Sequence, residues 1–393
     1  MPRSALTIAA ALALAALAVP ARAEDPLRIG FVASLSSPTS AAGPDMLDSF
    51  KLALKLLGNK LGGRDVALTV ADDELKPDVG VQKVRKMLDE DKDQLITGMV
   101  LSNIALAEAR TVLPRKVFML SLNAGPSVLA GAECSPYWFS AAYQSDTIAE
   151  GMSIYLQNKG VPSVSLIAPN YTAGRDVLTG FKRYYKGTIK TETYTPLDQF
   201  DFAAELAEIR AAAPDATFFF YTSGAPAISF VKEYAESGLK GKIPLYGLAF
   251  SLDEQTLPGM GDAALGVHDS TFWTADMDNP ANRAFVAAFE KEYHRTPSIF
   301  AAHAWDGVHL LDAALTTVKG RIEDAVAFRK AMETVTFQSV RVHFRYNTNH
   351  FPIQDIHLAE IKRNAQGQLE NSYVERIVAD HADAYAVQCH MPP

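Results

Sequence analysis

A strand that ends in small polar residues is the first feature of this sequence that suggests chemistry. Residues 117–122 begin as a continuous apolar run, typical of a strand buried on both faces of a parallel sheet. The residues that follow are Asn123, Ala124, Gly125, Pro126 and Ser127. Gly permits unusual backbone angles, and Pro and Ser are common where a helix begins. Unpaired N–H groups at such a turn bind ligands in open α/β sheets, although an ordinary β–α connection has the same pattern.

Residues able to catalyse a reaction form no recognisable motif. The sequence contains no nucleophile elbow, phosphate-binding loop, zinc motif or dinucleotide fingerprint. Ser34 and Ser102 can be nominated as nucleophiles, but neither has a matched base. Asp72, Asp73 and Glu74 lack the spacing of a calcium loop, and we interpret them as a solvated turn. We therefore expect no enzymatic activity, no metal and no cofactor.

The first residues have the pattern of a secretory signal. Arg3 supplies the charge, residues 8–19 supply the apolar segment, and Ala21-Arg22-Ala23 is a small-x-small cleavage site. We expect cleavage near Ala23 and a periplasmic protein, since no later stretch is long enough to span a membrane. Removing Arg3 and Arg22 changes the net charge from −8 to −10, which disfavours nucleic acid and anionic membranes as partners.

The sequence has two cysteines, Cys134 and Cys389. An exported protein meets oxidising conditions, so we favour a disulfide that ties the C-terminal tail to the first half of the chain. Two free buried thiols remain the alternative. Neither cysteine lies in a cluster with metal-ligand spacing.

Strand and helix patterns alternate along the chain in two series, which predicts two Rossmann-like βα lobes of an α/β protein. Lobe 1 is expected to contain residues 24–141 and 275–338, and lobe 2 residues 142–274 and 339–393. Helices over 280–318 return to the first lobe, and strands near 355–362 and 372–378 extend the second. The chain then crosses between lobes about three times, near 140–144, 270–276 and 337–348, and this arrangement suits closure around a small ligand.

The order and spacing of several short motifs resemble type I periplasmic solute-binding proteins of the leucine/isoleucine/valine-binding family, which serve ABC importers. The motifs are Ile29-Gly30-x-x-x-Ser34-Leu35-Ser36, Gly98-x-x-x-Ser102, Leu120-Ser121-Leu122-Asn123-Ala124-Gly125, Asn170-Tyr171-x-x-Gly174-Arg175-Asp176 and Ala302-x-Ala304-Trp305-Asp306. The resemblance covers the mature chain and departs from the usual pattern at Leu122, where many members carry Pro. It implies a ligand cleft between the lobes.

A narrower likeness points to the aromatic-acid-binding branch of that family. It is carried by residues 124–137, from Ala124-Gly125-Pro126-Ser127 to Cys134-Ser135-Pro136-Tyr137, and by Gln388-Cys389. In the amino-acid binders, a Glu just after the strand end equivalent to Gly247 typically holds the ammonium group of the ligand, but here the neighbourhood is Gly247-Leu248-Ala249-Phe250, without an acid. An aromatic residue there leaves a buried ammonium without a partner, which costs several kcal/mol, and instead offers ring contact.

The resemblance also implies the pocket residues. Hydroxyls and helix starts of lobe 1 would receive a carboxylate, and aromatic side chains of lobe 2 and the first crossing would contact a ring. The candidates are Ser34, Ser36, Ser102, Asn103, Asn123, Ala124, Gly125, Tyr143, Gln144, Tyr171, Tyr221 and Phe250. Helix capping is the alternative role of Ser102 and Asn103. We interpret Arg175 as paired with Asp176 or another acid rather than with ligand.

The expected function is therefore the extracytoplasmic receptor of an ABC importer for a benzoate, hydroxybenzoate or cinnamate. Its partners would be permease subunits, and the receptor itself is expected to be a monomer. A branched-chain amino acid or another small acid is the alternative ligand. An extracytoplasmic sensor of the same fold is the alternative role.

Overall fold

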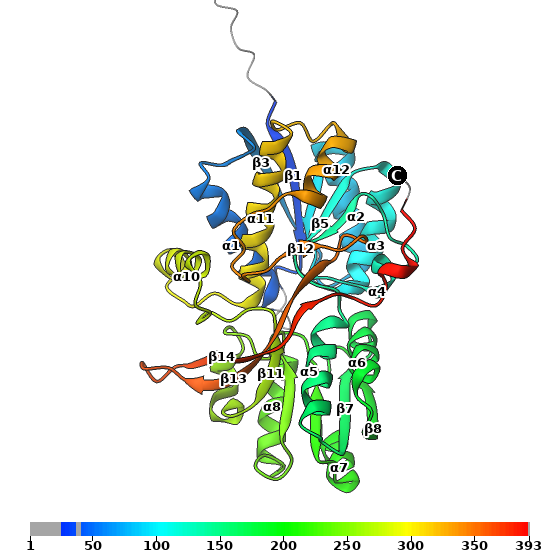
Figure 1. Cartoon of the computed structure of the whole chain (residues 1–393), viewed down its shortest axis with the longest axis vertical. Helices are drawn as coiled ribbons and strands as arrows, with labels where there is room; N and C mark the ends of the chain where they lie inside the picture. Colours follow the sequence, from blue (N-terminus) through cyan, green and yellow to red (C-terminus); the bar gives the residue numbers. More distant parts are fainter. Residues whose placement is uncertain (1–24, 37–40, 392–393) are drawn as a thin grey trace, which may run out of the picture.

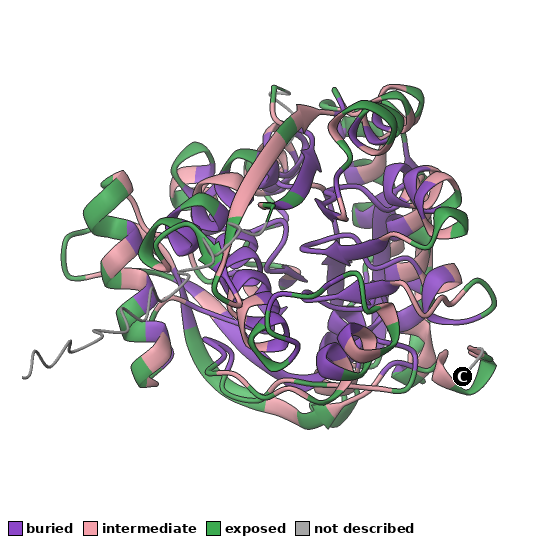
Figure 2. Cartoon of the chain, turned by 90° about the horizontal axis from the view of Figure 1, so that it is seen from above, coloured by how far each residue is buried: buried purple, intermediate pink, exposed green. Residues whose placement is uncertain are grey.

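The computed structural model describes residues 25–36 and 41–391, so the predicted export signal lies outside the described residues. The described chain forms two α/β lobes, drawn one above the other in Figure 1. Each lobe has its own sheet, with helices on its faces. Figure 2 shows that the central strands are buried while exposed residues gather on the outer sides of the helices. The predicted fold class is confirmed.

The sheet of the first lobe is built around β1 (Leu27–Ala33), an apolar strand that pairs in parallel on both sides. The strand order is β2-β3-β1-β4-β5-β6. The other strands are β2 (Lys60–Leu61), β3 (Arg64–Asp72), β4 (Leu95–Gly98), β5 (Phe118–Ser121) and β6 (Trp138–Ser140). Because these strands are parallel, except for the short β2, their carboxyl ends meet at one edge of the sheet.

Helices from distant parts of the chain cover this sheet. The early ones are α1 (Ala42–Leu56), α2 (Pro77–Lys86), α3 (Ser102–Val112) and α4 (Ser127–Ala130). The late ones are α10 (Pro280–Tyr293), α11 (Ile299–Thr317) and α12 (Ala325–Thr334). The buried faces of α1 and α11 pack together, and the Ser49 hydroxyl donates a hydrogen bond to the Ala301 carbonyl at 2.6 Å. The late helices therefore lie on the first lobe, as their lack of accompanying strands suggests.

The second sheet has the order β12-β13-β11-β10-β9-β7-β8, and β14 pairs with β13. Its strands are β7 (Ser163–Pro169), β8 (Thr188–Thr195), β9 (Ala216–Phe219), β10 (Leu245–Leu248), β11 (His268–Thr271), β12 (Arg345–Tyr346), β13 (Pro352–Arg363) and β14 (Leu369–His381). Its helices are α5 (Thr147–Asn158), α6 (Thr172–Tyr184), α7 (Ala203–Ala212), α8 (Ala225–Glu236) and α9 (Leu257–Met260). The closing strands extend this sheet: β13 pairs antiparallel with β11, and β14 pairs antiparallel with β13. No helix in the described ranges is both long and apolar enough to cross a membrane.

A buried arginine ties together two of the segments that join the lobes. Arg341, only 1 % exposed, pairs with Asp306 of α11 at 2.9 Å. The same guanidinium donates to the Ala141 and Ala142 carbonyls, at 2.5 and 2.9 Å. Burying a charge is costly unless its hydrogen bonds are satisfied, and here they link the first crossing to the third. This role of Arg341 was not predicted from the sequence.

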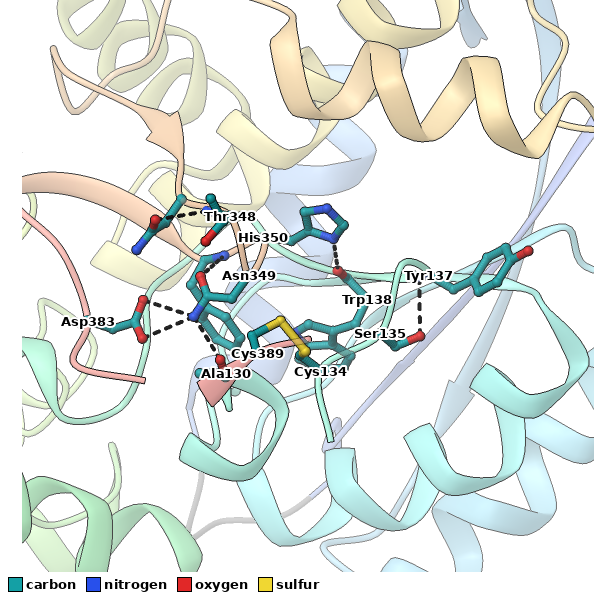
Figure 3. Close-up of a disulfide and its surroundings, with 12 residues drawn as sticks. Ala130, Cys134, Ser135, Tyr137, Trp138, Thr348, Asn349, His350, Asp383 and Cys389 are labelled. Carbon is teal, nitrogen blue, oxygen red and sulfur yellow. Dashed lines mark hydrogen bonds between the residues drawn. A yellow bond between two sulfur atoms is a disulfide. The ribbon is translucent and has the colours of Figure 1, made fainter. Parts of the chain in front are cut away.

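The C-terminal tail returns from β14 to the first lobe, where the favoured disulfide is present (Figures 1 and 3). Cys134 and Cys389 are bonded, with their Cα atoms 5.6 Å apart. Beside the bond, the Asn349 amide donates to the Ala130 carbonyl at 2.8 Å and to Asp383 at 3.0 Å. Upstream of the bond in the same tail, the Tyr385 hydroxyl donates to Asp146 at 2.8 Å, so the tail contacts both lobes.

A buried carboxyl in the second sheet predicts a pH-dependent stability. Burial raises the pKa of Asp269 on β11 to about 8, opposed by the Asn371 side chain. At pH values between the pKa of Asp269 in the unfolded chain and its raised pKa in the folded protein, the folded protein binds a proton that the unfolded chain has lost. The free energy of unfolding therefore falls as pH rises through this range, by up to about 1.4 kcal/mol per pH unit. Asp269→Asn should therefore raise Tm more at pH 8 than at pH 5. The exposed control Asp198→Asn should not; an equal shift at both pH values would contradict this reading.

Candidate functional site

A pocket lies between the two lobes and is lined by residues of both. Its lining atoms surround about 450 Å³ of space, a figure that includes the opening to solvent. The lining residues are Ala42, Val100, Leu101, Ser102, Asn123, Tyr143, Ser145, Tyr171, Ala173, Val177, Phe220, Thr222, Ser223, Phe250 and Phe300. The residues come mainly from the carboxyl ends of strands and the helix starts that follow them, where ligands bind in open α/β sheets.

Aromatic side chains form two stacked pairs in this pocket. Tyr143 and Phe250 lie with ring centroids 4.4 Å apart and planes 24° apart. Tyr171 and Phe220 lie 6.3 Å apart, at 27°. Phe300 adds a third surface, 5.9 Å from Phe250. The pocket therefore offers flat apolar walls to a ring.

Asn123 orients Tyr143. The Tyr143 hydroxyl donates to Asn123 Oδ1 at 2.9 Å, and Asn123 Nδ2 donates to the Val100 carbonyl at 2.7 Å. Burial raises the pKa of Tyr143 well above its usual value, so the ring stays a neutral phenol. Because both the oxygen and the nitrogen of its side-chain amide are hydrogen-bonded within the protein, the main role of Asn123 is to hold the Tyr143 ring in the pocket wall.

Ser102 is the first residue of α3, and Leu101 occupies the capping position. The capping role that was an alternative for Ser102 is therefore not observed, and the residue lines the pocket. Ser145 also lines it, although its neighbour Gln144 was the predicted residue. The Ser145 hydroxyl is buried and has no hydrogen-bond partner among the described residues. An unpaired buried hydroxyl is costly unless a ligand or water satisfies it.

Helix starts and the absence of ionised side chains define the electrostatics of the pocket. α1, α3, α6 and α8 begin at or directly beside lining residues. The first N–H groups of a helix have no partner within it and carry a partial positive charge, which favours an anion. Among the described residues that line the pocket, none is an Asp, Glu, Lys, Arg or His. A ligand ammonium would therefore find no carboxylate there.

Ser34 and Ser36 do not line this pocket, because two aspartates take up their hydroxyls. Ser34 donates to Asp73 at 2.6 Å, and the Ser36 side chain hydrogen-bonds Asp72. Asp73 is completely buried, so the interpretation of residues 72–74 as a solvated turn is wrong at this position. The two carboxylates instead brace the loop after β1. In the described ranges, no group of three or more His, Cys, Asp or Glu is arranged to hold a metal.

Five other candidates also lie outside the lining. Gln144 bonds Asp146 at 3.0 Å, and the Tyr221 hydroxyl lies 3.1 Å from Thr195 Oγ1 within the core of the second lobe. The Ala124 N–H donates to the Met99 carbonyl at 3.1 Å, so it is not free for a ligand. Gly125 and Asn103 are the remaining two.

Gly125 is required by a close approach of two backbone segments. An added Cβ would lie 2.2 Å from the Tyr143 carbonyl oxygen, and the Ser145 N–H donates to the Gly125 carbonyl at 2.8 Å. The unusual backbone angle expected for this glycine is not observed, because its φ is not positive. Gly125 thus lets the strand end touch the first crossing.

Arg175 pairs with neither Asp176 nor another acid among the described residues, contrary to expectation, and it does not line the pocket. Its guanidinium donates to Asn170 Oδ1 at 3.0 and 2.9 Å and lies on the exposed side of α6. The lining residues Val100, Leu101, Ala173, Val177, Thr222, Ser223, Phe220 and Phe300 were not predicted. Phe220 has no distinguishing signal, because an apolar residue at a strand end has the same sequence pattern in a protein core as in a pocket wall.

Comparison with known proteins gives the same fold over almost the whole chain. A family model described as "Periplasmic binding protein" matches residues 26–368. The Leu/Ile/Val-binding protein homolog 6 of Brucella melitensis is 24% identical over 95% of this chain and 97% of its own.

Two solved structures share the architecture. A solute-binding protein of an ABC transporter from R. palustris, in complex with benzoate, has a TM-score of 0.87 at 27% identity, covering 93% of this chain and 99% of its own. A second, from Rhodopseudomonas palustris BisB5 in complex with 3,4-dihydroxy benzoic acid, has a TM-score of 0.86 at 28% identity, covering 92% and 99%.

Proposed function

We propose that this chain, which belongs to the periplasmic binding protein family and is the solute-binding component of an ABC transporter, takes an aromatic carboxylate as its ligand. Members of this family bind solutes and are not enzymes. The finer proposal is a benzoate, hydroxybenzoate or cinnamate, held by closure of the two lobes and delivered to permease subunits.

The composition of the pocket wall is the observation that carries this proposal. Two stacked aromatic pairs suit a ring, while helix starts and the hydroxyls of Ser102 and Ser145 suit a carboxylate. The lack of a carboxylate among the described lining residues disfavours an α-amino acid. The benzoate and dihydroxybenzoate bound by the two similar structures support the same class.

A panel of ligands in a thermal-shift assay tests this proposal. We expect benzoate, 4-hydroxybenzoate or cinnamate to raise Tm, with a Kd in the micromolar range or below. Stabilisation by leucine, isoleucine or valine, with none by any aromatic acid, would favour the alternative that the name of the Brucella relative suggests.

Tyr171 provides a prediction at single-residue level. Tyr171→Ala should weaken binding of the aromatic acid about 10-fold, because it removes one member of the Tyr171–Phe220 stack. Tyr171→Phe should stay within about threefold, since it keeps the ring. The control is Tyr184→Ala, an exposed tyrosine at the last residue of α6, the helix that Tyr171 precedes. Isothermal titration measures all three; unchanged affinity for Tyr171→Ala would remove the residue from the site.

Export by cleavage near Ala23 and a monomeric state complete the proposed picture. N-terminal sequencing of the secreted protein tests the first. Light scattering at several protein concentrations tests the second.

A further inference from the structure

One hydrogen-bonded pair joins the two lobes close to the pocket without lining it. Ser127 begins α4 in the first lobe, and Asp176 lies on α6 in the second. The Ser127 N–H donates to Asp176 Oδ2 at 2.9 Å, and its hydroxyl donates to Oδ1 at 2.8 Å. Both oxygens of the Asp176 carboxylate, in the second lobe, thus accept hydrogen bonds from Ser127 of the first lobe. Figure 1 shows α4 and α6 facing each other across the boundary between the lobes.

Each partner is attached rigidly to a wall of the pocket. Pro126 precedes Ser127 with a φ of −63°, and Gly125 before it is wedged against the Tyr143 carbonyl. On α6, Asp176 directly precedes Val177, which lines the pocket, and follows Tyr171 by little more than one turn. Rotation of α6 away from α4 would therefore open the pocket and remove both donors from the carboxylate together.

Two other hydrogen bonds link the lobes away from the crossing segments and the C-terminal tail. The Ala41 N–H donates to the Ser223 carbonyl at 3.3 Å, and Gln255 Nε2 donates to the Thr296 carbonyl at 3.2 Å. Both are neutral and long. Hydrogen bonds to a carboxylate are roughly twice as strong as neutral ones, and here two converge on one group that is partly shielded from water.

We propose that Ser127 and Asp176 form a latch, a pair of positioning residues that holds the lobes closed over a bound solute. The pair slows ligand release and contributes little to ligand encounter, because it forms only once the lobes have met. This inference requires a solute that binds by closure, but it does not require that the solute be aromatic.

Stopped-flow fluorescence tests the latch, with benzoate and L-leucine each used as a probe so that whichever binds reports on closure. We expect Asp176→Ala to raise koff about 10-fold while kon stays within about twofold. Asp176→Asn keeps the shape and should lie between Asp176→Ala and the native chain. Ser127→Ala removes only the hydroxyl donor and should raise koff about threefold, whereas Ser127→Thr should restore the native rate. Arg175→Ala, next to Asp176 but bonded within its own lobe, is the matched control.

The double variant distinguishes a latch from a general weakening of the fold. If the two residues act through each other, Ser127→Ala should have no further effect on koff in the Asp176→Ala background. Additive effects, or a koff equal to that of the native chain, would overturn the proposal. Binding of L-leucine in place of benzoate would overturn the aromatic ligand but leave the latch to be judged by the same rates.

Discussion

Ser102→Asp should reduce the affinity for benzoate by about 100-fold. The substitution places a carboxylate at the first residue of α3, in the pocket wall, where it would face the carboxylate of the bound benzoate. Two like charges about 5 Å apart in a partly buried site repel each other by about 3 kcal/mol, which corresponds to roughly two orders of magnitude in Kd. The fold should tolerate the change, because an aspartate in the first turn of a helix is favoured by its dipole.

Ser102→Asn is the matched control, since it has nearly the shape of aspartate and no charge. We expect it to retain affinity within about 10-fold. The difference between the two variants, measured by isothermal titration with Tm as a check on folding, isolates the charge of the ligand. Equal affinities for the aspartate and asparagine variants would mean that no anionic group binds near α3.

Removing the disulfide should have the largest effect on stability. Cys134 and Cys389 are separated by 255 positions, so the bond closes a very long loop. The chain-entropy model gives an upper value of about 5 kcal/mol, and native disulfides commonly contribute about 2–5 kcal/mol. Cys134→Ala combined with Cys389→Ala should therefore lower Tm by about 3–6 °C.

The native chain treated with a thiol reductant is the comparison for this double variant, and mass spectrometry under both conditions counts the thiols. The two should melt at similar temperatures, below the oxidised protein. A double variant with the same Tm as the oxidised protein would show that the disulfide does not restrain the unfolded chain.

The sequence predicted the elements well wherever hydrophobic periodicity and breakers agree. The helices expected over residues 280–318 are α10 and α11, and the strands expected near 355–362 and 372–378 lie within β13 and β14. The closing strands were assigned to the second sheet and lie there. In these segments, local propensity and tertiary burial favour the same structure, so a single sequence suffices.

The candidate site was harder to predict, because it depends on which polar groups find other partners. Ser34 and Ser36 have the same composition as binding serines, but Asp73 and Asp72 accept their hydrogen bonds. Ser145 was not predicted, because it reaches the pocket only through the contact between Gly125 and the first crossing, which no local pattern indicates.

The burial of Arg341 could not be predicted from the sequence for a similar reason. Its acceptors are Asp306 and two backbone carbonyls almost 200 positions away, at Ala141 and Ala142. A lone arginine in a loop-like stretch predicts solvent exposure, and only the convergence of the crossings makes a buried position favourable.

Isothermal titration of the ligand-free protein with benzoate, benzamide and L-leucine tests the central claim most directly. Benzoate and benzamide share the ring and differ in charge, while L-leucine carries the ammonium that the pocket does not match. We predict a micromolar or lower Kd for benzoate, at least 10-fold weaker binding of benzamide, and no measurable heat from L-leucine. Tight binding of L-leucine together with no binding of benzoate would contradict the account.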